Sequence, residues 1–374
     1  MIYFDNAATT KPSDNAMEEA QKFYNQCYFN PSALYKEGLN VSRYIKSAKE
    51  TILSVLGARN HDVIFTSCGS ESNNTAIFGA VKKGVFVTDK GEHASVNACF
   101  LDKKNNGEKV EFIDLLPDGC IDTTKLYEYV KNNRVDFVSL IHVNNETGAI
   151  NDVNKICENL KKLNPKILIH VDGVQSFGKI VFTLSEYIDY YSISAHKING
   201  LKGVGALIKR KNAKLSPLVL GGGQENGLRS GTENVYGIKV FDIVTKEHYN
   251  NIKRNYDYVK ELNEIVKEGL NKDIFTIISS KACSPYILSV SAVGLRGEVI
   301  MHTLEEKGIL VGNGSACSSK NRFSRVIEAC GYDNKVLDGV LRISFSPDNT
   351  AEETEYLVTQ LNEIALKLKG IMKI

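Results

Sequence analysis

Short apolar runs that alternate with longer amphipathic stretches constrain the fold of this chain more than any other feature. The runs are rich in β-branched residues, as buried strands are, and helix-length segments separate them. They lie at residues 63–65, 85–87, 137–143, 167–171, 191–194 and 204–208. This alternation predicts an α/β fold in which helices flank a mostly parallel sheet. Such sheets bind ligands beyond the carboxyl ends of their strands, so we look for a site there.

The pattern changes after about residue 250, where a long charged stretch at 251–272 is typical of a helix. Predicted strands and helices follow at 286–291, 298–307, 341–345 and 351–368. A chain of 374 residues is long enough for two domains. We therefore predict a large domain over 13–250 and a smaller α/β domain formed by 1–12 and 251–374.

Composition argues against several classes of protein. The net charge of +2 gives no support for a nucleic-acid partner, and no apolar run approaches the ~20 residues that a membrane span needs. Residues 1–5 have neither the basic nor the apolar region of a signal peptide, so we expect a cytoplasmic protein without a membrane partner. The eight cysteines include no C-x-x-C pair, which predicts free thiols and no standing metal site.

Residues 66–74 join a predicted strand to a predicted helix at 75–81 and contain Gly69 and Ser70. Backbone amides at such a helix start, together with the helix dipole, can hold a phosphate. Simple capping by Ser or Thr is the alternative interpretation. The segment matches neither G-x-x-x-x-G-K-[ST] nor G-x-G-x-x-G, so nucleotide binding is less favoured.

Other predicted strand ends carry residues that suit an aromatic cofactor. Asp172 could hold a protonated ring nitrogen and Gln175 could reach a ring oxygen, although an Asp after a strand often only forms a turn. His93 could lie over an aromatic ring, and Asn145 follows another strand. Arg342 could bind a substrate carboxylate as a bidentate fork. Each of these residues is, by itself, more often structural than catalytic.

Lys197 also follows a predicted strand, directly after Ser194 and His196. A lysine amine becomes nucleophilic when its pKa is lowered and can then form a Schiff base, while Ser194 and His196 could hold a phosphate. An exposed loop lysine is the ordinary alternative. The glycine-rich loop at 221–234, which contains Thr232, indicates a backbone that approaches a ligand closely, with a flexible surface loop as the alternative.

Cys317 lies in a loop of small residues at 311–319, with Lys320, Arg322 and Arg325 just beyond. A cysteine reacts as the thiolate, and these basic residues could favour that form. We interpret the other cysteines of apolar surroundings as inert core residues; they are Cys27, Cys99, Cys120, Cys157, Cys283 and Cys330.

Together these segments resemble the cysteine desulfurases of the NifS/IscS type, which are class V, fold-type I pyridoxal-phosphate enzymes. The match runs in family order from 3–10 through 29–32 to 342–346 and so spans nearly the whole chain. Its most specific parts are residues 142–146, 229–232 and 314–317. The resemblance implies that the large domain binds pyridoxal phosphate and that the small domain carries the cysteine loop.

The resemblance also implies a role for each matching residue, with L-cysteine as substrate. Lys197 carries the cofactor, His93 stacks on its ring, Asp172 pairs with the ring nitrogen and Gln175 contacts the phenolic oxygen. Gly69, Ser70, Ser194 and His196 hold the phosphate, and Thr232 reaches it from the partner subunit of a homodimer. Asn145 lies in the cofactor site and, with Arg342, holds the substrate. Cys317 takes the sulfur as a persulfide.

That persulfide would pass to an acceptor protein, such as an iron–sulfur scaffold or a tRNA-thiolation enzyme, with at most a transient iron–sulfur contact at Cys317. The chain has no extension after its last predicted helix of the kind that some members use to dock a scaffold, which leaves the acceptor open. It also departs from the family pattern, with Ala195 and Cys68 where Gly is usual. We expect these two side chains to weaken cofactor binding. Gly173 and Val174 replace the usual Ala and Thr or Ser and remove a hydroxyl.

Two other kinds of protein remain as alternatives. A class V aminotransferase or selenocysteine lyase would share the fold, but Cys317 in a Gly/Ser loop argues against the aminotransferase. The other is a non-enzymatic binder that has kept the fold, such as a cofactor-dependent regulator, which would need a DNA-binding module. A degenerate scaffold would be expected to lose Lys197 or Cys317, and the chain keeps both.

Overall fold

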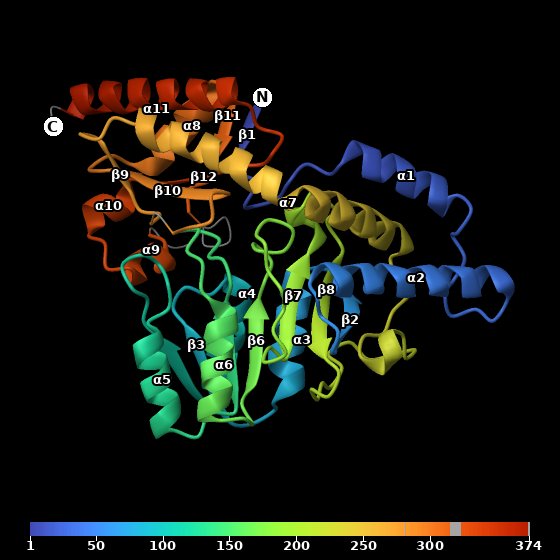
Figure 1. Cartoon of the computed structure of the whole chain (residues 1–374). Helices are drawn as coiled ribbons and strands as arrows, with labels where there is room; N and C mark the ends of the chain where they lie inside the picture. The colour runs from blue at the N-terminus through green and yellow to red at the C-terminus, as the bar shows by residue number, and fades with distance from the viewer. Residues whose placement is uncertain (281, 315–322, 373–374) are drawn as a thin grey trace.

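A computed structural model describes residues 1–280, 282–314 and 323–372 of the chain (Figure 1). Its largest sheet has seven strands in the order β2-β8-β7-β6-β5-β3-β4. Their bounds are β2 (His61–Thr66), β3 (Val85–Asp89), β4 (Lys109–Ile113), β5 (Phe137–Ile141), β6 (Leu168–Asp172), β7 (Tyr190–Ser194) and β8 (Gly205–Arg210). Within this sheet β8 is antiparallel to both neighbours, while the β4-β3-β5-β6-β7 pairs are parallel. The predicted mostly parallel sheet is confirmed.

Each of the six apolar runs of the sequence forms a strand of this sheet, but β4 was not predicted. It is an edge strand that pairs with β3 alone, and its residues are mostly half-exposed. A half-exposed strand alternates charged and apolar residues. In β4 the charged Lys109 and Glu111 alternate with the apolar Val110 and Phe112, so the strand has no continuous apolar run. That is why the search for apolar runs passed over it.

Helices cover both faces of this sheet (Figure 1). They are α1 (Asp14–Tyr24), α2 (Lys36–Val55), α3 (Gly69–Ala80), α4 (Ala94–Asn105), α5 (Thr123–Asn132), α6 (Val153–Leu163) and α7 (Val235–Gly269). Successive strand side chains point to opposite faces, so Tyr190 packs in the core under α3 and α4. Tyr191 packs in the larger core on the other face, which holds residues of α1, α2, α5, α6 and α7.

A second group of strands forms two small sheets. An antiparallel sheet of order β12-β10-β9 contains β9 (Phe275–Ile277), β10 (Ile287–Ala292) and β12 (Val340–Ser344). β1 (Ile2–Phe4) pairs in parallel with β11 (Ile309–Val311). The helices of this part are α8 (Gly297–Glu306), α9 (Arg325–Ala329), α10 (Asn334–Asp338) and α11 (Ala351–Met372). The pairing of β1 joins the first residues of the chain to its last third, as Figure 1 shows.

Helix α7 connects the two parts of the molecule. The sequence predicted a helix at 251–272, but α7 begins at Val235, where the Asn234 side chain caps it by accepting from the Gly237 amide. Its first half packs in the core of the large sheet through Phe241, and its second half packs against the small sheets through Leu262. The boundary that we propose at residue 250 therefore falls inside one continuous helix, at the point where its packing partners change.

None of the helices in the described part of the chain has the length and apolar character that crossing a bilayer requires.

Candidate active site

A cavity of about 230 Å³ lies at the carboxyl ends of the parallel strands, where the sequence predicted a site. The lining residues that the sequence singled out are Gly69, Ser70, His93, Asn145, Asp172, Gln175, Ser194, His196, Lys197 and Arg342. They follow β2, β3, β5, β6 and β7, except Arg342, which lies on β12 of the small sheet. Ala7 and Ala8 of the N-terminal segment also line the cavity. Cys317 lies outside the described residues.

Asp172 is the last residue of β6, and hydrogen bonds fix both of its carboxylate oxygens. Asn73 Nδ2 donates to Asp172 Oδ2 at 2.8 Å, and the Val174 amide donates to Oδ1 at 3.0 Å. Asn73 Nδ2 also lies 2.9 Å from Ser95 Oγ. Sequence reasoning missed Asn73, although its place one turn into α3, on the face of Gly69, could have indicated it. The carboxylate is thus buried and held in one orientation.

His93 caps the N-terminus of α4. Its Nδ1 accepts a hydrogen bond from the Ser95 amide at 3.1 Å, so the proton of the neutral ring is on Nε2. Burial is the largest influence on the His93 imidazole and lowers its pKa. The charge of Asp172 opposes this shift, and the charge of Lys197 adds to it. His93 therefore presents an uncharged aromatic ring to the cavity.

Lys197 follows β7 in a short 3₁₀ turn, η1 (Ala195–Lys197), and its Nζ contacts the N-terminal segment. Nζ donates to the carbonyl oxygens of Ala7 at 2.5 Å and Ala8 at 2.8 Å. Gln175 Nε2 donates to the same Ala7 oxygen at 2.8 Å. The sequence analysis included residues 3–10 in the family match, but it assigned no role to these two carbonyls. Every residue has a main-chain carbonyl, so the residue types in the sequence do not indicate which carbonyls make such contacts.

The phosphate-binding role predicted for Ser194 and its neighbours has a structural counterpart. Ser194 Oγ is buried at the cavity and has no hydrogen-bond partner among the described residues. Helix α3 begins at Gly69, where first-turn amides have no partner within the helix. A Cβ on Gly69 would lie 2.7 Å from Val174 Cγ2, so the site needs Gly there. An orphaned hydroxyl beside a helix N-terminus fits an anionic group such as a phosphate.

His196 lies beside this position and contacts the N-terminal segment. Its Nδ1 is 3.1 Å from Thr9 Oγ1, and its main-chain oxygen accepts from the Thr10 amide at 2.9 Å. Burial, followed by the charges of Lys197 and Lys179, lowers the pKa of His196 to about 3. The ring is therefore neutral at physiological pH and can only supply a hydrogen bond, not a charge, to an anion.

Arg342 is buried, and protein groups already use part of its guanidinium. One terminal nitrogen donates to Asp5 Oδ1 at 2.8 Å, and the other donates to the main-chain oxygen of Asn145 at 3.0 Å. Nε has no partner among the described residues. These two bonds use two of the five guanidinium N–H groups, so the Nε–H and one N–H on each terminal nitrogen are left for a ligand in this arrangement.

Thr232 is exposed and is not part of the cavity of its own chain. Its loop is nevertheless anchored near the cavity, because Arg229 Nε donates to Glu71 Oε1 of α3 at 2.9 Å. Glu71 Oε2 in turn accepts from the Ser67 amide at 2.7 Å. The predicted contact of Thr232 with a partner subunit stays a prediction.

The chain on either side of residue 317 is held beside the cavity. Ser324 Oγ donates to Glu146 Oε2, and a Cβ on Gly314 would lie 3.6 Å from the same oxygen. Arg325 donates to the carbonyl oxygens of Lys90 and Glu92, just before His93. Gly314 and Ser324 therefore both lie next to Glu146, the residue that follows the cavity-lining Asn145.

Burial keeps several of the other cysteines in the thiol form. It raises the pKa values of Cys99, Cys120 and Cys330 to about 12, and that of Cys157 further still. A thiol with such a pKa has almost no thiolate at neutral pH and is a poor nucleophile. These residues suit the inert role that the sequence predicted for them.

The departures from the family pattern have local explanations. Ala195 is fully buried in the core of the large sheet and is not part of the cavity wall, whereas Cys68 does line the cavity. A Cβ on Gly173 would lie 2.0 Å from Cζ of Tyr191, so the absence of a side chain at 173 makes room for that ring. Of the two added side chains, only Cys68 is placed to affect a bound cofactor.

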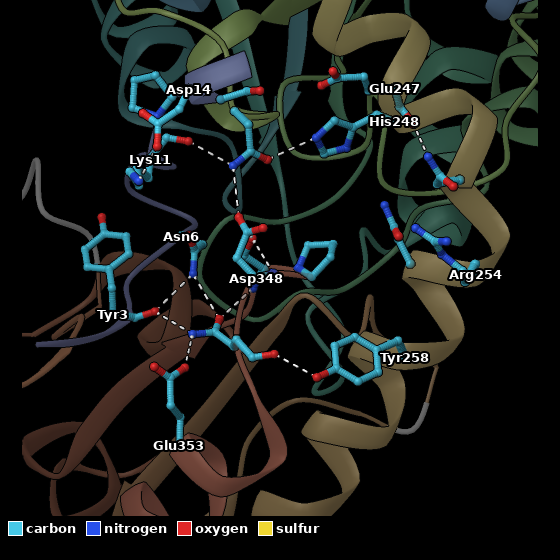
Figure 2. Close-up of a pocket in the computed structure, with 18 of the residues that line it drawn as sticks. Tyr3, Asn6, Lys11, Asp14, Glu247, His248, Arg254, Tyr258, Asp348 and Glu353 are labelled. Carbon is cyan, nitrogen blue, oxygen red and sulfur yellow. Dashed lines mark hydrogen bonds and ion pairs between the residues drawn. The ribbon is translucent and has the colours of Figure 1, made fainter. Parts of the chain in front are cut away.

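A second and wider hollow lies between the N-terminal segment, α7 and residues 346–349 (Figure 2). This cleft has a volume of about 1130 Å³, and its polar side chains bind one another. Asn199 Nδ2 donates to Asp348 Oδ2 at 3.3 Å, His248 Nε2 lies 3.0 Å from Asn199 Oδ1, and the Tyr258 hydroxyl donates to the Asn349 oxygen at 2.8 Å. None of the predicted catalytic residues lines it.

Comparison with known proteins identifies the family. The model of the class-V aminotransferases matches residues 2–357. The chain belongs to the class-V aminotransferase family. Among curated relatives of this family, a NifS/IcsS protein homolog of Lactobacillus delbrueckii subsp. bulgaricus is 34% identical over 97% of both chains. A cysteine desulfurase IscS of Dictyoglomus turgidum is 33% identical and covers 99% of this chain and 96% of its own.

Solved structures of class-V relatives share the fold. A NifS-like protein superposes with a TM-score of 0.90 at 33% identity, over 97% of this chain and 98% of the other. The structure of SspA in complex with cysteine has a TM-score of 0.80 at 29% identity and covers 94% of this chain and 100% of the other. The fold-type I architecture predicted from the resemblance is thereby confirmed.

Proposed function

We propose that this protein is a pyridoxal-phosphate-dependent cysteine desulfurase that converts L-cysteine to L-alanine and leaves the sulfur on Cys317. One observation carries the proposal. A lysine, a fixed carboxylate and an orphaned buried hydroxyl converge in one cavity, as Lys197, Asp172 and Ser194 do. A curated relative at 33% identity is named a cysteine desulfurase, and a similar solved structure holds cysteine.

The residues of the cavity fit pyridoxal phosphate. Lys197 would hold the cofactor, Asp172 would face its ring nitrogen and Gln175 its phenolic oxygen. Gly69, Ser70, Ser194 and His196 would bind the phosphate. When bound, the cofactor supplies an electron sink that weakens bonds of the attached amino acid.

The chain's own groups then position the substrate and move protons. Lys197 Nζ, set at the Ala7 and Ala8 oxygens, is the base and acid that takes and returns protons. Arg342 Nε and the Asn145 side chain would hold the substrate carboxylate. The Asn73 amide and the Val174 N–H fix the two oxygens of the Asp172 carboxylate, so that it would face the cofactor ring in one orientation.

The sulfur transfer balances without an added oxidant. The Cys317 thiolate attacks the substrate sulfur, so that an S–S bond forms and the Cβ–S bond breaks. The electron pair of that bond stays with Cβ, which takes a proton and becomes the methyl group of alanine. The sulfur transferred to Cys317 is oxidised and the carbon is reduced by the same two electrons. Gly314 and Ser324, both at Glu146, keep the chain on either side of Cys317 next to Asn145.

We also propose that the enzyme is a homodimer in which Thr232 completes the partner's phosphate site. Large apolar side chains are exposed on the single chain, including Tyr28 at 62%, Leu34 at 89% and Leu220 at 80%. Tyr28, Leu34 and Tyr35 belong to one loop, in which Tyr28 also stacks on Phe29, and apolar side chains gathered in this way are typical of surfaces that pair with another chain. The persulfide would pass to an acceptor protein, in iron–sulfur cluster assembly, tRNA thiolation or the synthesis of another sulfur-containing cofactor.

The decisive experiment measures alanine and sulfide formed from L-cysteine with pyridoxal phosphate and a thiol reductant. Wild type is compared with Cys317→Ala and with Cys27→Ala, which removes a cysteine that lies outside the cavity. We expect both products from wild type and Cys27→Ala, and less than about 1% of either from Cys317→Ala, because Cys317 is the proposed sulfur acceptor. Cys68 also lines the cavity, so products that persist in Cys317→Ala and disappear in Cys317→Ala/Cys68→Ala would assign that role to Cys68.

Other results would redirect the proposal. Full alanine formation by Cys317→Ala would remove Cys317 from the reaction. Formation of 3-mercaptopyruvate that depends on an added keto acid, with neither alanine nor sulfide formed from the cysteine, would favour the aminotransferase alternative. A wild-type protein that binds no pyridoxal phosphate would contradict the proposal as a whole.

A further inference from the structure

Lys179, a residue to which the sequence analysis gave no role, lies directly behind Gln175. It is only 3% exposed, and its Nζ donates to Gln175 Oε1 at 3.0 Å. The two residues share a turn in which the Ser176 and Phe177 amides donate to the Gly173 oxygen at 3.1 and 3.0 Å. This turn directs the lysine into the protein and toward the wall of the cavity.

Among the described residues, Lys179 is not held in an ion pair that would stabilise the fold. No carboxylate in the described part of the chain forms an ion pair with it, and the Tyr286 ring centroid lies 5.8 Å from Nζ. Burial is the main cause that lowers the pKa of Lys179 to about 7, and the charges of Lys197 and Arg342 add to it. A buried amine without a counter-charge costs stability, so an apolar side chain of similar size would suit the fold as well.

The hydrogen bonds of the Gln175 amide indicate what Lys179 does. At the other end of its amide, Nε2 donates to the Ala7 oxygen, which also accepts from Lys197 Nζ. A carbonyl can only accept, and Lys179 donates whether or not it is charged. The amide is therefore fixed with Oε1 toward Lys179 and its NH₂ group toward Ala7. An amide nitrogen has two N–H groups, so one remains for a ligand in the cavity that Gln175 lines.

We infer that Lys179 is a positioning residue that holds the Gln175 amide with its NH₂ group toward the cofactor's phenolic oxygen and toward the Ala7 carbonyl that binds Lys197. The inference rests on the proposed function, because it concerns the same cofactor site. Without Lys179, Gln175 Oε1 loses its donor, so the Ala7 oxygen alone orients the amide, and states with Oε1 toward the phenolic oxygen become less costly. The repulsion between these two acceptors would weaken cofactor binding.

A double-mutant cycle on the purified full-length protein tests this coupling. The Kd for pyridoxal phosphate is measured by absorbance titration of the cofactor-free protein for wild type, Lys179→Met, Gln175→Leu and the double variant. We expect each single variant to raise Kd about tenfold and to shift the visible absorbance maximum of the bound cofactor. In the Gln175→Leu background, Lys179→Met should change Kd less than about twofold. Equal effects of Lys179→Met in both backgrounds, or no effect in wild type, would overturn the inference.

A matched control separates positioning from general stability. Lys209 is also a buried lysine, but its Nζ donates to the carbonyl oxygens of Arg210, Lys211 and Ala213, away from the cavity. Lys209→Met should lower the urea midpoint of the cofactor-free protein and leave Kd within about twofold of wild type. Lys179→Met should show the opposite pattern. A loss of stability with an unchanged Kd in Lys179→Met would assign Lys179 a purely structural role.

Two further outcomes distinguish a failure of the proposed function from a failure of the inference about Lys179. A wild type that binds the cofactor but releases no sulfide contradicts the function, while the cycle still decides the role of Lys179. A wild type that binds no cofactor overturns both. If Lys179→Met does not fold, Lys179→Gln keeps a neutral N–H donor and is expected to stay within about threefold of the wild-type Kd. A loss as large as that of Gln175→Leu would then overturn the inference.

Discussion

The cavity and the cleft both have the N-terminal segment as a wall, yet their polar atoms behave differently. In the cleft, Asn199, His248 and Asp348 bind one another, so its surface is already satisfied (Figure 2). In the cavity, Ser194 Oγ and Arg342 Nε are buried without a partner among the described residues. Buried polar atoms are nearly always hydrogen-bonded in proteins, so an orphaned pair indicates a missing ligand. Between these two hollows, the unpaired polar atoms distinguish the cavity, although the cleft is the larger. Buried polar atoms without a partner also occur away from both, as at His61 Nδ1 and Thr88 Oγ1.

The largest expected effect comes from the carboxylate of the cavity. Asp172→Asn replaces an acceptor with an NH₂ group that meets the donor Asn73 Nδ2, and it removes the charge that faces the cofactor ring. We expect sulfide release from L-cysteine to fall about 100-fold, as loss of a hydrogen-bonded buried charge suggests. Steady-state kinetics at saturating cofactor give the measurement. Activity within threefold of wild type would mean that the carboxylate does not act on the cofactor.

A smaller effect is expected when the orphaned hydroxyl is removed. Ser194→Ala deletes a group with no partner in the described protein, so the urea midpoint of the cofactor-free form should stay the same or rise slightly. The Kd for pyridoxal phosphate should rise about five- to tenfold, because the phosphate loses a donor. A fall in stability with no change in Kd would show that the hydroxyl serves the fold, and the contrast with the cleft would lose its basis.

The smallest effect is expected in the cleft. Arg254 is an exposed residue of α7 that lines it, so Arg254→Ala leaves the cavity untouched. Both the cofactor Kd and the rate of sulfide release should stay within about twofold of wild type, since surface substitutions rarely have larger effects. Titration and sulfide assays run beside Ser194→Ala provide the comparison. A tenfold loss of activity would show that the cleft takes part in the reaction.

The residues of the cavity differ in whether the sequence could predict them. Asp172, Ser194 and Lys197 were predictable because each follows an apolar strand, and parallel strands bring their carboxyl ends to one edge. Asn73 was missed although its place one turn after Gly69 could have indicated it, whereas Lys179 acts only by contacting Gln175 and no sequence neighbour points to it. The Ala7 and Ala8 oxygens belong to the backbone, which every residue has.

Packing also explains departures that looked unfavourable in the sequence. Ala195 was expected to weaken cofactor binding, but its methyl group lies in the core of the large sheet. Gly173 leaves space for Tyr191, whose hydroxyl lies 2.6 Å from Ser176 Oγ and 3.1 Å from His142 Nδ1. The fold accommodates Ala195 because its side chain points into the core, and Gly173 because Tyr191 fills the space beside it. Neither the direction of a side chain nor a contact with a distant residue can be predicted from the residue type alone.

By itself, the sequence determined six of the seven strands of the large sheet, because burial imposes a local run of apolar residues on each of them. It also determined which residue types stand at the strand ends, and hence the family. The tertiary structure alone decided that α7 is continuous from Val235 to Gly269 and that β1 pairs with β11, more than 300 residues away in the chain. It also decided that Lys179 lies behind Gln175. These features depend on contacts between distant segments, whose energies appear only once the chain has folded.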